Sequence, residues 1–168
     1  KTAVANLADL MDRQLALLVD DKFNNGLPRN LSGATGPRAP INHGFKAVQI
    51  GASAWAAEAL KHTMPASVFS RSTESHNQDK VSMGTIAARD CLRVLTLTEQ
   101  VGAAHTLAVA QAVKLRLRHS PDAAPLPAAL RAWLETVTAQ SPFVDEDRAL
   151  EHELRAVRAW LADGGDLP

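Results

Sequence analysis

A run of seven consecutive polar residues, beginning at Glu74, holds the side chains best suited to chemistry. It contains the carboxylate of Glu74 and two side-chain amides, Asn77 and Gln78, followed by Asp79. The run comes immediately before a long stretch of helical periodicity, and the unpaired N–H groups of a helix start favour negative charge. One interpretation is structural: Asp79 or Ser82 caps that helix, and the amides bond nearby backbone. The other is that the carboxylate and amides converge on a ligand.

Other common signatures of chemistry are missing from the sequence. It contains no phosphate-binding glycine loop, no HExxH, no GxSxG and no dinucleotide fingerprint. The single cysteine, Cys91, excludes an internal disulfide and a cysteine-based zinc site. The histidines share no ligand spacing with a carboxylate or thiol, so we expect no metal site; they are His43, His62, His76, His105, His119 and His152.

The charge balance limits the classes of partner. The 168 residues include 18 Lys plus Arg and 18 Asp plus Glu, and 46% are hydrophobic. A chain without a basic surplus is not expected to bind nucleic acid. We find no apolar run long enough for a membrane span and no signal-peptide pattern, so we expect a cytoplasmic protein that does not bind membranes.

Helical periodicity dominates the elements that must position the polar run. Residues 2–18 predict an amphipathic helix whose apolar positions are Val4, Leu7, Leu10, Met11, Leu15 and Leu18. Residues 20–44 contain too many glycines and prolines for a helix. An alanine-rich helix over 45–63, ended by Pro65, would let another helix approach closely. No strand alternation is visible, so the predicted fold class is all-α.

The longest predicted helix, over residues 82–118, would span roughly 55 Å and is apolar on several sides. The chain offers too few other helices to cover it, which suggests a fragment or an intertwined oligomer. After a linker at 121–127 we predict a helix over 128–140. A last helix is expected to be capped by Asp145 and ended by Gly164 and Gly165.

Five segments resemble, in order, the aromatic amino acid ammonia-lyases and aminomutases. The stretch from Glu74 to Asp79 is similar to the Glu-x-His-Asn-Gln-Asp motif of that family. The other segments are Asp12-Arg13-Gln14 with Asn25-Gly26-Leu27-Pro28, Gly44 to Ile50, Val81-Ser82-Met83-Gly84 with Ala88-Arg89, and Ala110-Gln111-Ala112-Val113. The resemblance covers residues 3–161.

The resemblance implies a long-helix bundle, incomplete in this chain, that forms a homotetramer with active sites built from several subunits. Residues 1–120 would be the C-terminal part of the central bundle, with the active-site loop and pocket helix, and residues 121–168 a C-terminal helical segment. Glu74, Asn77 and Gln78 match the polar wall of the family's site. Lys46 and Ile50 match its substrate-binding helix, whereas by themselves they suggest a solvated lysine and a core residue.

Two departures from the family matter. The family uses 4-methylideneimidazol-5-one (MIO), formed from an Ala-Ser-Gly tripeptide, and a catalytic tyrosine, but this chain has neither the tripeptide nor any tyrosine. Both normally lie upstream of the matched region. The resemblance therefore implies the C-terminal third of a subunit, which would be active only with the missing N-terminal part.

The resemblance favours phenylalanine or tyrosine as substrate. The histidine-specific branch usually has one more residue before Val-Ser-Met than the segment from Asn77 to Met83. Elimination of ammonia to an aryl acrylate and migration of the amine to a β-amino acid stay equally open. The alternative is a non-catalytic helical assembly subunit that keeps the fold.

Overall fold

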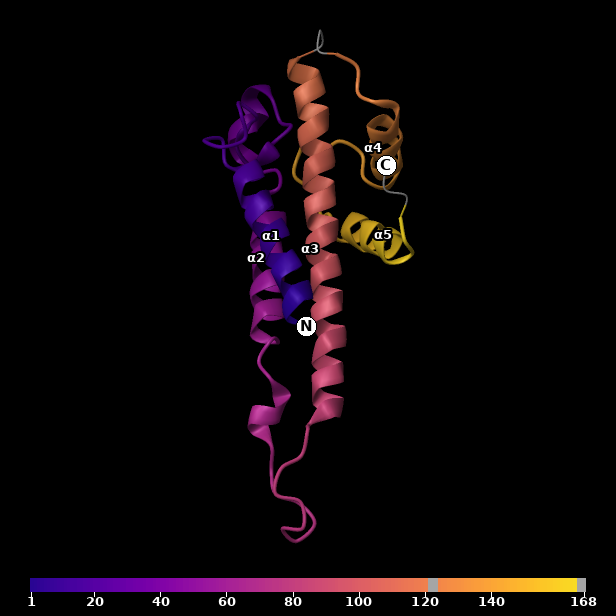
Figure 1. Ribbon diagram of the computed structural model, residues 1–168. Helices are drawn as coiled ribbons and strands as arrows, with labels where there is room; N and C mark the ends of the chain where they lie inside the picture. The colour runs from indigo at the N-terminus through magenta and orange to yellow at the C-terminus, as the bar shows by residue number, and fades with distance from the viewer. Residues whose placement is uncertain (121–123, 166–168) are drawn as a thin grey trace.

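The computed structural model describes residues 1–120 and 124–165, and within them all regular structure is helical, which confirms the all-α prediction. Figure 1 shows α3 as a long rod with α1 and α2 on one side and the C-terminal helices on the other. The α-helices are α1 (Thr2–Val19), α2 (Lys46–Lys61), α3 (Gly84–His119), α4 (Ala128–Gln140) and α5 (Glu151–Ala162).

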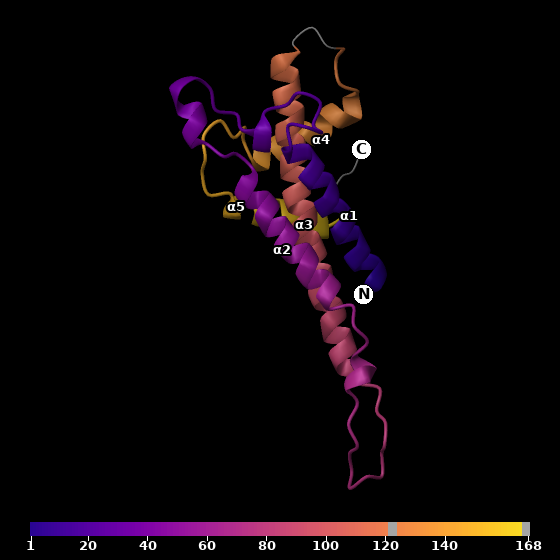
Figure 2. The ribbon, with the colours of Figure 1, turned by 90° about the vertical axis from the view of Figure 1, so that its left-hand side faces the viewer.

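The core forms where α1, α2 and α3 pack along one another (Figures 1 and 2). Small side chains allow this close approach, because α2 buries Ala52, Ala56 and Ala59 against the larger residues of α3. Burying one of these larger residues, such as Leu97, contributes about 1.5–3 kcal/mol. The alanine content therefore sets the spacing of the three helices.

Helix α1 forms as predicted, but it buries only some of the predicted apolar positions. Its buried positions are Ala5, Ala8, Asp12, Leu15 and Val19. Leu7, Leu10 and Leu17 are exposed, so not all apolar positions of the predicted amphipathic helix pack in the core. The alanines fit against α2 and α3, and the leucines form a second apolar face that the described residues do not cover.

Helix α3 has 36 residues and is about 54 Å long. Its first turns extend beyond α1 and α2 (Figure 2). Ile86, Leu92 and Leu95 are exposed along its N-terminal half, in agreement with the prediction that the chain does not fully cover this helix. The capping interpretation is wrong: Met83, with φ 55°, occupies the N-cap and no side chain caps the helix. Ser82 Oγ lies before the N-cap and accepts a hydrogen bond from the N–H of Gly84, two residues later, at 3.3 Å.

Helix α5 starts later than predicted. It begins at Glu151, so the prediction that Asp145 caps it is wrong. The intervening segment is held in place by Asp147, whose carboxylate accepts the backbone N–H groups of His43 and Gly44 at 2.8–3.0 Å. Tertiary contacts therefore stabilise non-helical backbone there.

The prediction that Gly164 and Gly165 end the last helix is confirmed. Gly164 has φ +86° and donates to Leu161 O, while Gly165 donates to Trp160 O. These two bonds satisfy carbonyls that the helix leaves unpaired at its end.

The loop between α1 and α2 is irregular, as predicted, with two short 3-10 turns at Arg29–Leu31 and Gly36–Ile41. The buried Gln111 of α3 holds it: its Nε2 donates to Leu31 O at 3.2 Å and to Val144 O at 2.7 Å, and its Oε1 accepts from Val144 N at 3.1 Å. Gly44, with φ +52°, lies so close to Asn30 and Ser32 that a Cβ would collide with their backbone. This packing fixes the start of α2.

Two further predictions concern the chain's organisation. The predicted linker over 121–127 lies partly outside the described residues, and the division into residues 1–120 and 121–168 stays a prediction. Among the described helices, none combines the length and the apolarity that crossing a membrane requires.

Candidate functional site

The predicted polar run forms the tip of a loop that extends from the end of the helical bundle (Figures 1 and 2). At this tip Thr73 and Gln78 pair as an isolated antiparallel bridge, with N···O distances of 3.0 and 3.2 Å between their backbones. The four residues between them make the turn. The bridge thus holds Glu74 and Asn77 on one short reversal of the chain.

The backbone of this turn is strained. Glu74, Ser75 and His76 have φ values of 53°, 53° and 70°, in the left-handed region that side chains with a Cβ rarely adopt. Each such residue costs about 1–2 kcal/mol. Strain of this kind is concentrated at functional sites, and here it includes Glu74, one of the three residues that the sequence selected.

Glu74, Asn77 and Gln78 are all exposed. Asn77 Nδ2 donates to Glu74 Oε2 at 3.2 Å, and this is the one side-chain hydrogen bond of Glu74 within the described residues. The Gln78 amide makes no side-chain hydrogen bond there. The tip thus presents one carboxylate and two amides with most of their hydrogen-bonding capacity free.

Helix α3 does not stabilise charge at this tip. Residues 79–83 separate Gln78 from the start of α3, and extended backbone of that length spans roughly 15 Å. The effect of a helix dipole is confined to about its first turn. The expectation that the N-terminus of α3 stabilises negative charge beside Glu74 is therefore wrong within this chain.

The other predicted pair, Lys46 and Ile50, lies one helical turn apart on α2. Both are exposed, Ile50 at 58%. The core-packing interpretation of Ile50 is therefore wrong in this chain. Both side chains lie on the outer face of α2, away from the buried Val48 and Ala52.

The two predicted groups do not meet within one chain. Lys46 opens α2, whereas the loop with Glu74 lies beyond the other end of this 16-residue helix, which is about 24 Å long. Within this chain Lys46 lies close to Ile50, and Glu74 lies close to Asn77. Lys46 does not face Glu74.

Sequence reasoning missed a polar chain that joins α1 to α2 beside this outer face. Asp12 is 2% exposed, and its Oδ1 accepts a hydrogen bond from Ser53 Oγ at 2.7 Å. Gln49 Nε2 donates to the same Ser53 Oγ at 2.9 Å. Arg13 pairs with the other carboxylate oxygen, and this contact raises the pKa of Arg13. The sequence signals were Asp12 on an otherwise apolar face and the positions of Asp12 and Gln49 within two of the segments that resemble the family.

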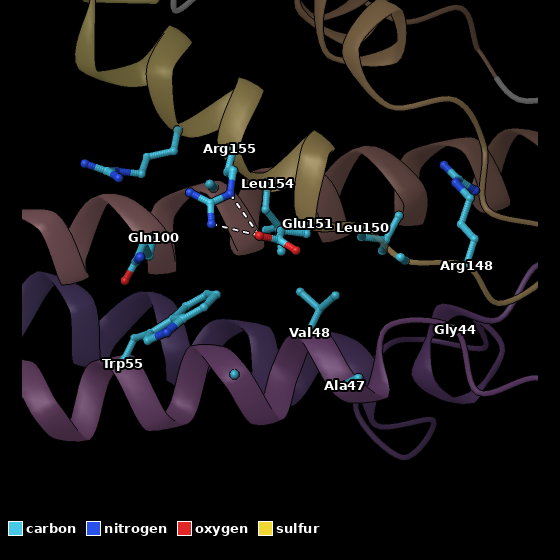
Figure 3. A pocket seen from close by; sticks show the side chains of 14 residues that line it. Gly44, Ala47, Val48, Trp55, Gln100, Arg148, Leu150, Glu151, Leu154 and Arg155 are labelled. Atoms are coloured by element: carbon cyan, nitrogen blue, oxygen red, sulfur yellow. Dashed lines mark hydrogen bonds and ion pairs between the residues drawn. The ribbon is translucent and has the colours of Figure 1, made fainter.

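A groove of about 510 Å³, also missed, lies between α2 and α5 above α3. Figure 3 shows Val48 and Trp55 on one side and Leu154 on the other. The Arg155 guanidinium donates to Glu151 at 2.8 Å, and this bond lowers the pKa of Glu151. Neither Lys46 nor Ile50 lines the groove, because α2 presents a different face to it. The groove is therefore separate from the predicted substrate-binding pair.

The described residues contain no group of three or more His, Cys, Asp or Glu side chains that could hold a metal ion. The candidate site therefore consists of the loop tip and the outer face of α2.

Comparison with known proteins identifies relatives for most of the chain. The profile of the aromatic amino acid lyase family matches residues 1–138. A tyrosine ammonia-lyase from Cereibacter sphaeroides is 40% identical over 95% of this chain, and a histidine ammonia-lyase from Gloeobacter violaceus is 33% identical over 96%. The crystal structure of a tyrosine aminomutase from Streptomyces globisporus superposes on 96% of the chain with a TM-score of 0.84 and 32% identity.

The matched region is a limited part of these relatives. The chain spans 29% of the length of the tyrosine ammonia-lyase, 30% of the histidine ammonia-lyase and 29% of the aminomutase chain. The loop tip and the outer face of α2 both lie within residues 1–138.

Proposed function

The chain belongs to the aromatic amino acid lyase family, and from this premise we propose that it supplies one part of an active site for aromatic L-amino acids. As the C-terminal portion of such an enzyme, it would act in elimination of ammonia or in 2,3-migration of the amine. The observation that carries the proposal is the loop tip: Glu74, Asn77 and Gln78 belong to the segment that resembles the family's motif, and all three are exposed with most of their hydrogen-bonding capacity unused.

We propose that the complete enzyme uses the MIO group. The chain contains no Ala-Ser-Gly, so the tripeptide has to lie on another segment. The exposed amides of Asn77 and Gln78 suit the carbonyl and nitrogen atoms of such a group, and the strained turn holds both on one short segment. When bound, the group supplies an electrophile for the substrate amine.

Each candidate residue has a distinct role in this proposal. The Glu74 carboxylate accepts hydrogen bonds from the substrate ammonium, and such charge-assisted bonds are about twice as strong as neutral ones. In elimination, the Cα–N bond breaks, a β proton leaves to a base on another segment, and an aryl acrylate and ammonia result. Lys46 and Ile50 contact the far end of the substrate.

We further propose that the active site is completed between subunits of a homotetramer. The separation of Lys46 from Glu74 supports this, because one copy cannot bring both to one substrate. The exposed leucines Leu7 and Leu10, one turn apart on α1, also support it, since a large exposed apolar patch usually marks a contact.

The proposed substrate is phenylalanine or tyrosine. The spacing before Val-Ser-Met supports this, as does the higher identity to the tyrosine ammonia-lyase, 40% against 33% for the histidine ammonia-lyase. Elimination and migration share the residues named above, so both activities belong to the proposal.

The test is turnover by this chain assembled with the segment that carries Ala-Ser-Gly. We expect ultraviolet absorbance from an aryl acrylate, or a β-amino acid by chromatography, on addition of L-tyrosine or L-phenylalanine. An assembly that contains the prosthetic group by absorbance but converts neither amino acid would contradict the proposal and favour a non-catalytic assembly subunit.

A further inference from the structure

The polar chain between α1 and α2 has a defined direction of hydrogen bonding. Asp12 is buried, and the guanidinium of Arg13 donates to its Oδ2, so both carboxylate oxygens of Asp12 act as hydrogen-bond acceptors. Ser53 has one hydroxyl hydrogen, and it points to Asp12 Oδ1 at 2.7 Å. Ser53 Oγ can therefore only accept from its other neighbour, Gln49.

This direction fixes the amide of Gln49. Its Nε2 must face Ser53 Oγ, at 2.9 Å, because an oxygen in that place would meet the lone pairs of Ser53. Gln49 Oε1 is then turned away from Ser53, and no described residue donates to it. A buried carboxylate on one helix thus determines that a residue on the next helix presents an acceptor.

Gln49 lies beside the predicted substrate-binding pair. It follows Lys46 by three residues, which places the two on neighbouring positions of α2, and it directly precedes Ile50. Unlike Lys46 and Ile50, Gln49 is partly buried, because its side chain leans towards Ser53. Its oxygen is therefore held in place and not free to rotate with solvent.

We propose that Gln49 Oε1 is a specificity determinant that accepts a hydrogen bond from a donor on the substrate's ring. The inference rests on the proposed function, in which the far end of the substrate meets this face of α2. A phenol O–H or an imidazole N–H provides such a donor, whereas a phenyl ring leaves the acceptor unpaired and is disfavoured. Asp12 and Ser53 are positioning residues that act through Gln49.

The test compares kcat/KM for tyrosine, histidine and phenylalanine in the complete enzyme. Asp12→Asn offers an amide that can donate to Ser53. Ser53 then donates to Gln49, so the direction of hydrogen bonding is reversed and the Gln49 NH₂ group turns towards the substrate. We expect this variant, and Ser53→Ala, to lower the preference for a donor-bearing ring over phenylalanine by about three- to tenfold. Ser53→Thr keeps the hydroxyl and should keep the preference.

Two further variants separate this effect from a loss of stability. Thr98→Val removes a different hydroxyl, whose Oγ1 donates to Val94 O within α3 at 2.8 Å, and it should leave the preference unchanged. Gln49→Met removes the acceptor without leaving Asp12 unpaired. It should lower the preference even if Asp12→Asn does not fold.

The outcomes distinguish the inference from the function on which it rests. A fall in the tyrosine-to-phenylalanine ratio supports a phenol donor, and a fall in the histidine-to-phenylalanine ratio supports an imidazole donor. If the wild-type enzyme converts none of the three, the proposed function fails. If it converts them but Ser53→Ala and Gln49→Met leave both ratios within about twofold of wild type, the inference is overturned.

Discussion

Replacing Glu74 by Gln isolates the charge of the carboxylate at the loop tip. The side chain is exposed and its one hydrogen bond within the described residues, from Asn77 Nδ2, is 3.2 Å long. Glutamine keeps an acceptor oxygen for that bond, so stability should change by no more than about 0.5 kcal/mol. A helix-capping role, which would cost about 1 kcal/mol, is excluded because Met83 occupies the N-cap.

Turnover should respond very differently. A hydrogen bond to a charged group contributes about 1.5–3 kcal/mol, so its loss in the transition state should lower kcat/KM by about 10- to 150-fold. The assay is steady-state formation of aryl acrylate, with the melting temperature and the absorbance of the prosthetic group measured on the same sample. If the enzyme is an aminomutase, the ratio of acrylate to β-amino acid should also change, because the ammonium must be held while it migrates.

Glu135→Gln provides the matched control, because Glu135 is an exposed carboxylate on α4, outside the candidate site. It should leave both turnover and melting temperature unchanged. Wild-type kcat/KM and product ratio in Glu74→Gln would refute the assignment of Glu74 to the substrate ammonium.

Three other changes test separate parts of the structure. Ile50→Ala should change the ratio of kcat/KM for ring-substituted and unsubstituted phenylalanine by about tenfold, and an unchanged ratio would remove Ile50 from the site. Gln111→Leu leaves buried backbone groups of Leu31 and Val144 unpaired and should lower the free energy of unfolding by about 2–4 kcal/mol in denaturant titrations, whereas a loss below about 1 kcal/mol would contradict its anchoring role. Burial lowers the pKa of His105 below its ordinary 6.5, so protonation of His105 favours the unfolded chain and stability should fall as pH drops below about 6.5. The check is the melting temperature as a function of pH, and a pH dependence that His105→Leu leaves unchanged would argue against this role.

The helical fold could be predicted because helix formation depends on local contacts. The structure places α1 at Thr2–Val19 and α3 at Gly84–His119, close to the predicted 2–18 and 82–118. The glycine end of α5 was also visible in the sequence, since its two bonds join residues three and five apart. The start of α5 was not, because Asp147 bonds to His43 and Gly44, more than a hundred residues away in the chain.

In the candidate site, too, local sequence predicted some features and contacts between distant residues decided the others. Residue types and spacing alone selected Glu74, Asn77 and Gln78, but their place on a strained turn away from α3 depends on the path of the whole loop. Asp12 was visible only on an otherwise apolar face and as part of a segment that resembles the family, and Ser53 carried no signal at all. They meet because the alanines of α2 let α1 approach closely, and only that packing buries a carboxylate where it can orient a neighbouring amide.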